Sequence, residues 1–286
     1  MAARASKPKC SPTAKRPRDL ASAPATNLST LIYEAEALAC LNSNLSNPLP
    51  RIKANLLVPP NKGVDFGAVG TAYDYWVRYQ IAGSAVETFL GYRLCVERYG
   101  DYPAARKELR KHERSLLQPR PGQSPELLAA CLFLAKFETE YRSGYPVQTF
   151  DVSTKNVQEL ERICSITNLR IFRTGPTILN PIFTIAGSRL TIRADGDLVV
   201  HDTLIDLKTT SKIELKDNIR QLISYAVLND LAGPKVPFDR VGVYYARFDE
   251  LITFDLKQLL KAREWSSISA FFRAKLGTNL TRHLTT

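Results

Sequence analysis

The stretch RADGDLVVHDTLIDLKTTSKIELKDNIRQLISY, residues 193–225, decides the fold. Within it, residues 198–200 and 204–208 have the composition of two strands, and a polar turn separates them. Side chains alternate between the two faces of a strand, so Asp206 and Lys208, two residues apart, project from the same face. If the strands pair as a hairpin, Asp197 joins them at one end of a small sheet. A buried cluster of this kind is costly unless a cation and a substrate use it.

The chemistry that suits such a cluster is metal-assisted hydrolysis of a phosphodiester. Carboxylate and carbonyl oxygens are the ligands that Mg²⁺ and Mn²⁺ prefer. A bound metal polarises the phosphate and acidifies a water, and Lys208 can orient that water or neutralise charge on the phosphorane. The alternative is an exposed hairpin whose ion pairs contribute only about 0–1 kcal/mol each.

The longer pattern resembles the core of the PD-(D/E)XK nuclease superfamily, in the branch of RecB nuclease domains and CRISPR-adaptation nucleases. That branch has a Gly-x-Asp before an apolar run, then Ile-Asp-x-Lys-Thr, then a helix with Gln-x-x-x-Tyr. In this chain the first element departs slightly, because Gly196 directly precedes Asp197. The matching residues are Asp195-Gly196-Asp197, Ile205-Asp206-Leu207-Lys208-Thr209, and Gln221 with Tyr225.

The resemblance implies a role for each of these residues. Asp197, Asp206 and the Leu207 carbonyl would bind the metal, and Lys208 would be the catalytic lysine. Gln221 and Tyr225, four residues apart on one helix face, would steady the lysine or contact the DNA backbone. Two alternatives stay open from the sequence: Tyr225 packs in an amphipathic helix, or Asp195 is the ligand in place of Asp197.

A second match lies upstream, in residues 66–74, FGAVGTAYD. Members of this branch often carry a helix with Gly, three residues, and a metal-binding His. Asp74 stands at the position of that His, and aspartate is a hard ligand suited to Mg²⁺. The alternative is that Asp74 is an N-terminal helix residue that interacts with the helix dipole.

The charge of the chain agrees with a nucleic-acid partner. The net charge is +11 and the isoelectric point is near 9.5, which favours a polyphosphate through counterion release. The first nineteen residues hold six basic residues and one acid, and their Ala, Ser and Pro content predicts disorder. The helix expected over residues 104–117 carries a second basic cluster, for which a plain solvated face is the preferred interpretation.

Other compositional features exclude several classes. There is no apolar signal-peptide core and no span of about 20 apolar residues, so we expect no membrane association and a cytoplasmic location, nucleoid-associated in a bacterium, with a nuclear location as the alternative. The five cysteines show no metal-ligand spacing, and none follows Cys164. The CRISPR-adaptation nucleases that the chain resembles carry cysteines near the C-terminus for an iron–sulfur cluster. This chain has none after Cys164, so we predict no iron–sulfur cluster here. Cys131 is expected in the core, and the three histidines are too dispersed for a zinc site.

Periodicity gives the coarse order of elements. Helices are expected over residues 31–41, 67–81, 84–98, 103–117, 125–142 and 157–166, around the helix that bears Gln221, and from the Asp255 cap to Leu276. Further strands are expected over residues 169–172, 178–179, 183–185, 188–192, 241–245 and 251–254.

These elements predict a mixed α/β (α+β) fold, with a helical N-terminal half packed on a mixed β-sheet core flanked by helices. The resemblance implies that this core is restriction-endonuclease-like. We expect a disordered basic tail over residues 1–27, a helical region over 28–168 that forms one wall of a cleft, and the nuclease core over 169–286. A single compact unit is expected, because Asp74 has to reach the sheet to bind metal.

The function that follows is a Mg²⁺- or Mn²⁺-dependent deoxyribonuclease in repair, recombination or defence against foreign DNA. DNA as the substrate rests on the resemblance alone. No helicase P-loop is visible, so unwinding would need a helicase or complex partner, and a homodimer is the other assembly considered. The alternatives are a nuclease-fold module that binds DNA with little or no activity, and a scaffold within a larger complex.

Overall fold

The hairpin expected from the sequence forms the centre of the protein. We describe a computed structural model over residues 25–44, 49–83, 89–117, 123–233 and 236–277. Strand β5 (Leu198–Val200) pairs antiparallel with β6 (Thr203–Lys208), and Leu198 lies opposite Ile205. The turn between them holds His201 at a φ of 60°. The predicted pairing of these two strands is therefore confirmed.

The hairpin belongs to a mixed sheet with the strand order β2-β5-β6-β7-β8. Strand β5 pairs antiparallel with both β2 and β6, whereas β6 and β7 run parallel. A parallel neighbour requires a crossover connection, and helix α8 (Leu215–Leu231) provides it. The remaining strands are β2 (Thr177–Leu179), β7 (Arg240–Tyr245) and β8 (Glu250–Asp255).

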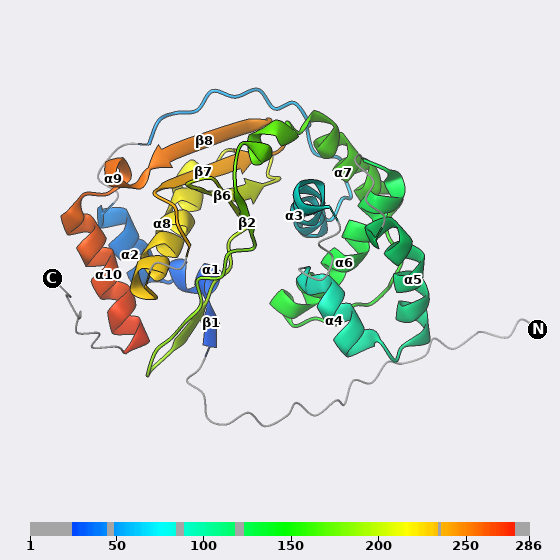
Figure 1. Cartoon of the computed structure of the whole chain (residues 1–286), viewed down its shortest axis with the longest axis horizontal. Coiled ribbons are helices and arrows are strands. Elements are labelled where there is room, and N and C mark those ends of the chain that lie inside the picture. The colour runs from blue at the N-terminus through cyan, green and yellow to red at the C-terminus, as the bar shows by residue number, and fades with distance from the viewer. Residues whose placement is uncertain (1–24, 45–48, 84–88, 118–122, 234–235, 278–286) are drawn as a thin grey trace, which may run out of the picture.

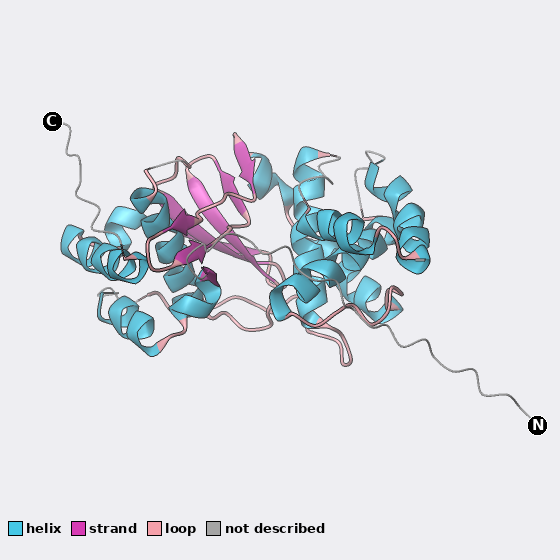
Figure 2. Cartoon of the chain, turned by 90° about the horizontal axis from the view of Figure 1, so that it is seen from below, coloured by secondary structure: helices cyan, strands magenta, loops and turns pink. Residues whose placement is uncertain are grey.

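Both faces of this sheet are covered, which explains why its strands are apolar on both sides. Leu198, Ile205 and Tyr244 face a core that they share with the helical half of the chain. Val199 and Leu204 face a second core built with α8 and the C-terminal helix. Figure 2 shows the strands lying between two groups of helices. The mixed α/β class predicted from the sequence is confirmed.

The helical half packs around α3 (Phe66–Ala82) and α6 (Pro125–Ser143), which lie against each other. Both helices begin at a side-chain cap: Asp65 accepts a hydrogen bond from Ala68 N–H at 3.0 Å, and Ser124 from Leu127 N–H at 3.2 Å. Figure 1 shows α3 between the sheet and the other helices of this half. Those helices are α4 (Leu90–Tyr99), α5 (Pro103–Leu117) and α7 (Thr154–Ile166).

The first described elements lie in the other half of the molecule. Helices α1 (Leu28–Ile32) and α2 (Ala35–Asn44) pack against α8 and α10 (Ala262–Leu276), on the far side of the sheet from α3. The buried side chains Leu28, Leu31, Ile32 and Leu41 belong to the core beneath that face. The described part of the chain therefore begins in the sheet half, passes through the helical half, and ends in the sheet half.

Several expected boundaries are wrong. Residues 169–172 form a 3₁₀ helix (Leu169–Arg173) in place of a strand, because the Asn168 side chain caps its first turn by accepting from Arg170 N–H at 3.2 Å. Residues 25–27, assigned to the tail, form strand β1 (Ala25–Asn27), which pairs parallel with β4 (Thr191–Arg193). Strand β4 also pairs with β3 (Ile185–Ala186), so a small second sheet exists that the sequence did not predict.

Two expected helices are interrupted. The predicted helix over residues 31–41 breaks at Tyr33 and Glu34, between α1 and α2. The closing helix breaks after α9 (Leu256–Leu259), where Leu260 is extended. The cap expected at Asp255 is confirmed, since its side chain accepts from Lys257 N–H at 2.8 Å. Residues 1–24 of the expected basic tail, and residues 84–88 of one expected helix, lie outside the described residues.

Candidate active site

The strand register brings Asp197 and Asp206 together. Leu198 lies opposite Ile205, so one further step along the two strands sets Asp197 opposite Asp206. The Asp197 Oδ2 atom accepts a hydrogen bond from the Leu207 backbone N–H at 2.6 Å. Asp206 is 4% exposed. The two carboxylates therefore occupy one end of the hairpin, as the sequence predicted, and Asp197 is the partner of Asp206 in preference to Asp195.

The Leu207 carbonyl points to the same edge as Asp197. Along a β-strand the N–H and C=O of one residue point to the same side, and those of the next residue to the other side. The Leu207 N–H points toward Asp197, whereas the Lys208 carbonyl accepts from Ala246 N–H on the β7 side at 2.8 Å. Three oxygen-bearing groups, two carboxylates and one carbonyl, thus converge where β5 begins.

Lys208 links this end of the sheet to helix α8. Its Nζ donates to Asp206 Oδ1 at 3.0 Å and to Gln221 Oε1 at 3.3 Å. The Gln221 amide in turn donates to the Tyr225 hydroxyl at 2.7 Å. The Tyr225 ring stacks on Phe183 with centroids 5.3 Å apart, so this residue is both packed in the core and hydrogen-bonded toward the lysine.

Burial and neighbouring charges set the electrostatics of these groups. Burial raises the pKa of Asp206 to about 6; the Lys208 ammonium opposes that rise and the Asp197 charge adds to it. Burial lowers the pKa of Lys208, but the Asp206 and Asp197 charges outweigh it and the net pKa is raised. Lys208 is therefore held as an ammonium beside the carboxylates.

Asp74 reaches the same cluster from α3. A Cβ on Gly70 would lie 3.2 Å from Thr209 Oγ1, so the glycine lets α3 approach the end of β6 closely. Asp74 follows one turn later, more than two turns into α3, which makes the helix-dipole alternative wrong. Burial raises the pKa of Asp74 to about 8, Arg78 opposes the rise, and the charges of Asp197 and Glu138 add to it. The Asp197 charge therefore acts on Asp74, and the approach of Gly70 to Thr209 brings α3 toward the end of β6.

Asp74 is engaged by an arginine that the sequence argument missed. Arg78 Nε donates to Asp74 Oδ1 at 2.8 Å, and its NH2 group donates to Oδ2. The Arg78 side chain is 6% exposed, so this is a buried, bidentate ion pair. The four-residue spacing of Asp74 and Arg78 on a helix is the signal that predicts such a pair.

A second carboxylate and arginine pair flanks the site on α6. Glu138 is buried; one of its carboxylate oxygens accepts from the Tyr75 hydroxyl and the other from Arg142. Burial raises the pKa of Asp195, Arg142 lowers it, and Glu138 and Asp197 raise it further. The available sequence signal was a glutamate, Glu138, directly after the apolar run 127–137 of one helix, followed four residues later by Arg142.

The donors suit a hard divalent cation. Asp206 Oδ2 is buried and lies 2.9 Å from the Lys208 ammonium, and a carboxylate oxygen has two lone pairs, so one remains available for a cation. Asp197, Asp206 and the Leu207 carbonyl offer only oxygen, which fits Mg²⁺ or Mn²⁺. Among the described residues, no three His, Cys, Asp or Glu side chains are already gathered as a metal site. Asp74 holds one Arg78 donor on each carboxylate oxygen, so it could join the ligands only through its remaining lone pairs or by leaving Arg78.

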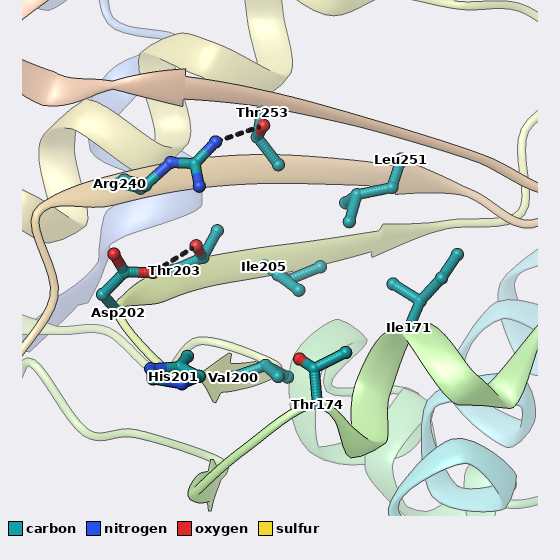
Figure 3. Close-up of a pocket in the computed structure, with 10 residues that line it drawn as sticks. All are labelled: Ile171, Thr174, Val200, His201, Asp202, Thr203, Ile205, Arg240, Leu251 and Thr253. Carbon is teal, nitrogen blue, oxygen red and sulfur yellow. Dashed lines mark hydrogen bonds between the residues drawn. The ribbon is translucent and has the colours of Figure 1, made fainter.

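A separate hollow of about 540 Å³ lies at the opposite end of β6. Thr203 and Lys208 mark the two ends of this strand, roughly 17 Å apart at about 3.3 Å per residue. Figure 3 shows Arg240 donating to Thr253 across its rim, above an apolar floor. The residues that line it are Ile171, Thr174, Val200, His201, Asp202, Thr203, Ile205, Arg240, Leu251 and Thr253. None of them belongs to the carboxylate cluster.

The remaining sequence expectations concern positions away from the site. Cys131 is buried as predicted, and so are Cys95 and Cys164. The basic residues of α5 are exposed, and α6 lies between that helix and α3, so this basic cluster is an outer face of the helical half. No helix in the described ranges is long and apolar enough to cross a bilayer.

Comparison with known proteins identifies no family for the chain, so the residues of the site are the basis for inferring its function. No model of a known protein family matches the chain, and a search of curated proteins gives no match either.

Proposed function

We propose that the protein is a metal-dependent nuclease that hydrolyses phosphodiester bonds of DNA. One observation supports this best: Asp197 and Asp206 lie on paired strands beside Lys208, and Gln221 holds the lysine from the following helix. Acid, acid and lysine at the end of one hairpin are the groups that such hydrolysis requires. The sequence resemblance to PD-(D/E)XK nucleases points to the same chemistry.

The roles of the residues follow from their contacts. Asp197, Asp206 and the Leu207 carbonyl would hold Mg²⁺ or Mn²⁺, which when bound polarises the scissile phosphate and acidifies a water. Lys208, fixed between Asp206 and Gln221, would orient the attacking water and stabilise negative charge on the phosphate in the transition state. Tyr225 would hold the Gln221 amide in the orientation that presents its oxygen to the lysine. In-line attack would leave a 5′-phosphate, as the resemblance implies.

The charge of the chain supports a polyanionic substrate. A net charge of +11 attracts nucleic acid to a site whose carboxylates alone would repel it. DNA is proposed over RNA on the resemblance, and repair, recombination or defence against foreign DNA is the proposed setting.

A module that binds DNA without cutting it is the second candidate, and one observation favours it. Arg78 occupies both carboxylate oxygens of Asp74, so the residue that stands in place of the family's histidine is already neutralised. On this interpretation the site holds a phosphate without activating water.

The test is cleavage of linear, closed circular and single-stranded DNA in Mg²⁺, Mn²⁺ or EDTA. Wild type is compared with Lys208→Ala and with Lys257→Ala, an exposed lysine at the opposite end of the sheet. Metal-dependent cutting that Lys208→Ala loses and Lys257→Ala keeps supports the nuclease. DNA binding by all three proteins without cutting supports the binding module.

A further inference from the structure

We propose that Arg142 is a substrate-binding residue whose guanidinium contacts a phosphate of the nucleic acid that enters the carboxylate site. The inference rests on the proposed nuclease function and identifies a residue of this chain that meets the substrate. Arg142 lies in the last turn of α6, and its side chain is 60% exposed although it is bound to Glu138.

Buried contacts hold the Arg142 guanidinium on one side. Glu138 accepts from Arg142 with one oxygen and from the Tyr75 hydroxyl with the other. Tyr75 is the neighbour of Asp74 in α3, and its hydroxyl also accepts from Gly91 N–H at 2.8 Å. A Cβ on Gly91 would lie 2.1 Å from the Leu134 carbonyl oxygen, so α4 and α6 are in close contact here. Three helices therefore hold Glu138, and Glu138 in turn holds one terminal nitrogen of the Arg142 guanidinium.

The Arg142 guanidinium, bound to Glu138 through one nitrogen and otherwise exposed, lies within electrostatic range of the site. Partial desolvation lowers the pKa of its guanidinium, but the charges of Glu138, Asp195, Asp197 and Asp74 outweigh it and raise that pKa. Those carboxylates come from α6, from the segment before β5, and from α3. Arg142 is thus a cation at the rim of the acidic cluster.

Arg78 and Lys208, the other cations of the cluster, already bind side chains of the site. Arg78 is buried and uses two nitrogens on Asp74, and Lys208 is bound to Asp206 and Gln221. Arg142 is largely open to solvent, so a phosphate can approach it without displacing any other group. A guanidinium is planar and binds phosphate through parallel N–H donors, which favours arginine for this contact.

A matched control exists on another helix. Arg162 of α7 donates to Glu159 at 3.1 Å, an acid with no exposed surface, while its own side chain is 39% exposed. The Arg162 and Arg142 pairs are alike in chemistry. Arg162 also donates to the Pro59 carbonyl and has none of the site carboxylates as a neighbour in these contacts.

The test measures binding of fluorescent 20-nucleotide single-stranded and duplex DNA in Ca²⁺, by anisotropy across a salt series. Arg142→Gln is expected to weaken binding about tenfold or more, as loss of a charged hydrogen bond does. The slope of log K against log salt should fall by about 0.7–0.9, one phosphate contact. Arg142→Lys should recover that slope, and Arg162→Gln should match wild type.

Glu138→Gln separates a substrate contact from a structural pair. This variant keeps an acceptor for Tyr75 and removes the charge that holds Arg142, so binding should stay equal to wild type or become tighter. Equal binding by Arg142→Gln and Arg162→Gln overturns the proposal. So does a loss in Glu138→Gln as large as that in Arg142→Gln. If wild type binds no DNA, both this inference and the proposed function fail; if it binds and cuts while Arg142→Gln is unchanged, only this inference fails.

Discussion

Leu207 donates its backbone N–H to the Asp197 carboxylate at 2.6 Å. Asp197, one candidate metal ligand, thus satisfies a backbone donor of β6, the strand that carries the other candidate ligand, Asp206. The side chain replaces the backbone acceptor opposite Leu207, the Gly196 carbonyl, which β5 would have supplied if it began two residues earlier. The same carboxylate therefore has a structural and a chemical task, and substitutions can separate them.

We expect Asp197→Asn to keep the fold and lose metal. The amide oxygen still accepts from Leu207, whereas the charge is gone, so Mn²⁺ affinity should fall at least tenfold with little change in melting temperature. Asp197→Ala should also lose the hydrogen bond, at about 1 kcal/mol of unfolding free energy. Calorimetric titration with Mn²⁺ and chemical denaturation measure the two effects. Equal destabilisation by both variants would contradict this division.

The pH dependence of stability should reflect the raised carboxyl pKa values. Asp206 and Asp74 have ordinary values of 3.8, and in the folded protein these rise to about 6 and about 8. Between those limits the folded state holds protons that the unfolded chain has released, so the free energy of unfolding should fall as pH rises from about 4 to about 8. Asp74→Asn should flatten the part of this fall above pH 6. Urea denaturation at a series of pH values gives the slope; a variant slope equal to that of wild type would refute the assignment.

Metal affinity should change in the opposite sense. A cation binds the deprotonated carboxylates, so Mn²⁺ affinity should rise from pH 6 to pH 8 as these groups lose their protons. Titration at pH 6, 7 and 8 measures this rise. An affinity that is flat over this range would mean that the ion binds elsewhere.

Gly70 and Gly67 offer a matched pair on one helix. Gly70→Ala brings a Cβ to 3.2 Å from Thr209 Oγ1 and should move α3, with Asp74, away from β6. Gly67→Ala meets only Asp65 Oδ1, at 3.5 Å, and should stabilise the helix by up to about 1 kcal/mol. We expect cleavage and Mn²⁺ affinity to fall in the first variant alone. Comparable losses in both would show that the approach of α3 to β6 does not matter.

A buried ion pair should dominate stability near the site. Arg247 Nε donates to the Thr209 carbonyl at 2.6 Å, and its NH1 group lies 2.5 Å from Glu159. Removing Arg247 leaves the buried Glu159 carboxylate with the partly exposed Arg162 as its remaining ion-pair partner, so Arg247→Met should lower the free energy of unfolding by up to about 3–5 kcal/mol. Adding Glu159→Gln should recover part of that loss, and denaturation of single and double variants measures the coupling. A double variant less stable than the sum of the singles would contradict this account.

The sequence predicted the parts of the site that lie close together along the chain. Asp197, Asp206 and Lys208 share one hairpin, and alternation along paired strands was enough to bring them together. Gln221 and Tyr225 share one helix, so their spacing sufficed. Strands overlapping β3 and β4 were expected, but their separation into a small second sheet was missed because its third strand, β1, has three residues and was assigned to the tail.

Contacts between segments far apart in the sequence could not be predicted from it. Nothing local to Asp74 indicates that Glu138, sixty-four residues later, lies close enough for its charge to raise the Asp74 pKa. The Arg142 contact to Glu138 follows helical spacing, but its position at the rim of the site depends on how α6 packs against α3 and α4. The strand expected over residues 169–172 failed because a side-chain cap at Asn168 favoured a tight helical turn over an apolar pattern.

The path of the chain, from α1 and α2 through the helical half and back to the sheet, limits which fragments of the protein can fold. The helical half is an insertion, because α1 and α2 fill the core beneath α8 before the chain builds α3 to α7 and comes back to the sheet. A fragment that starts at residue 169 would expose the apolar surface that Leu28, Leu31, Ile32 and Leu41 now cover. The sheet half is therefore assembled from segments on both sides of the insertion, and a ribosome must finish the insertion before the sheet that carries Lys208 can form.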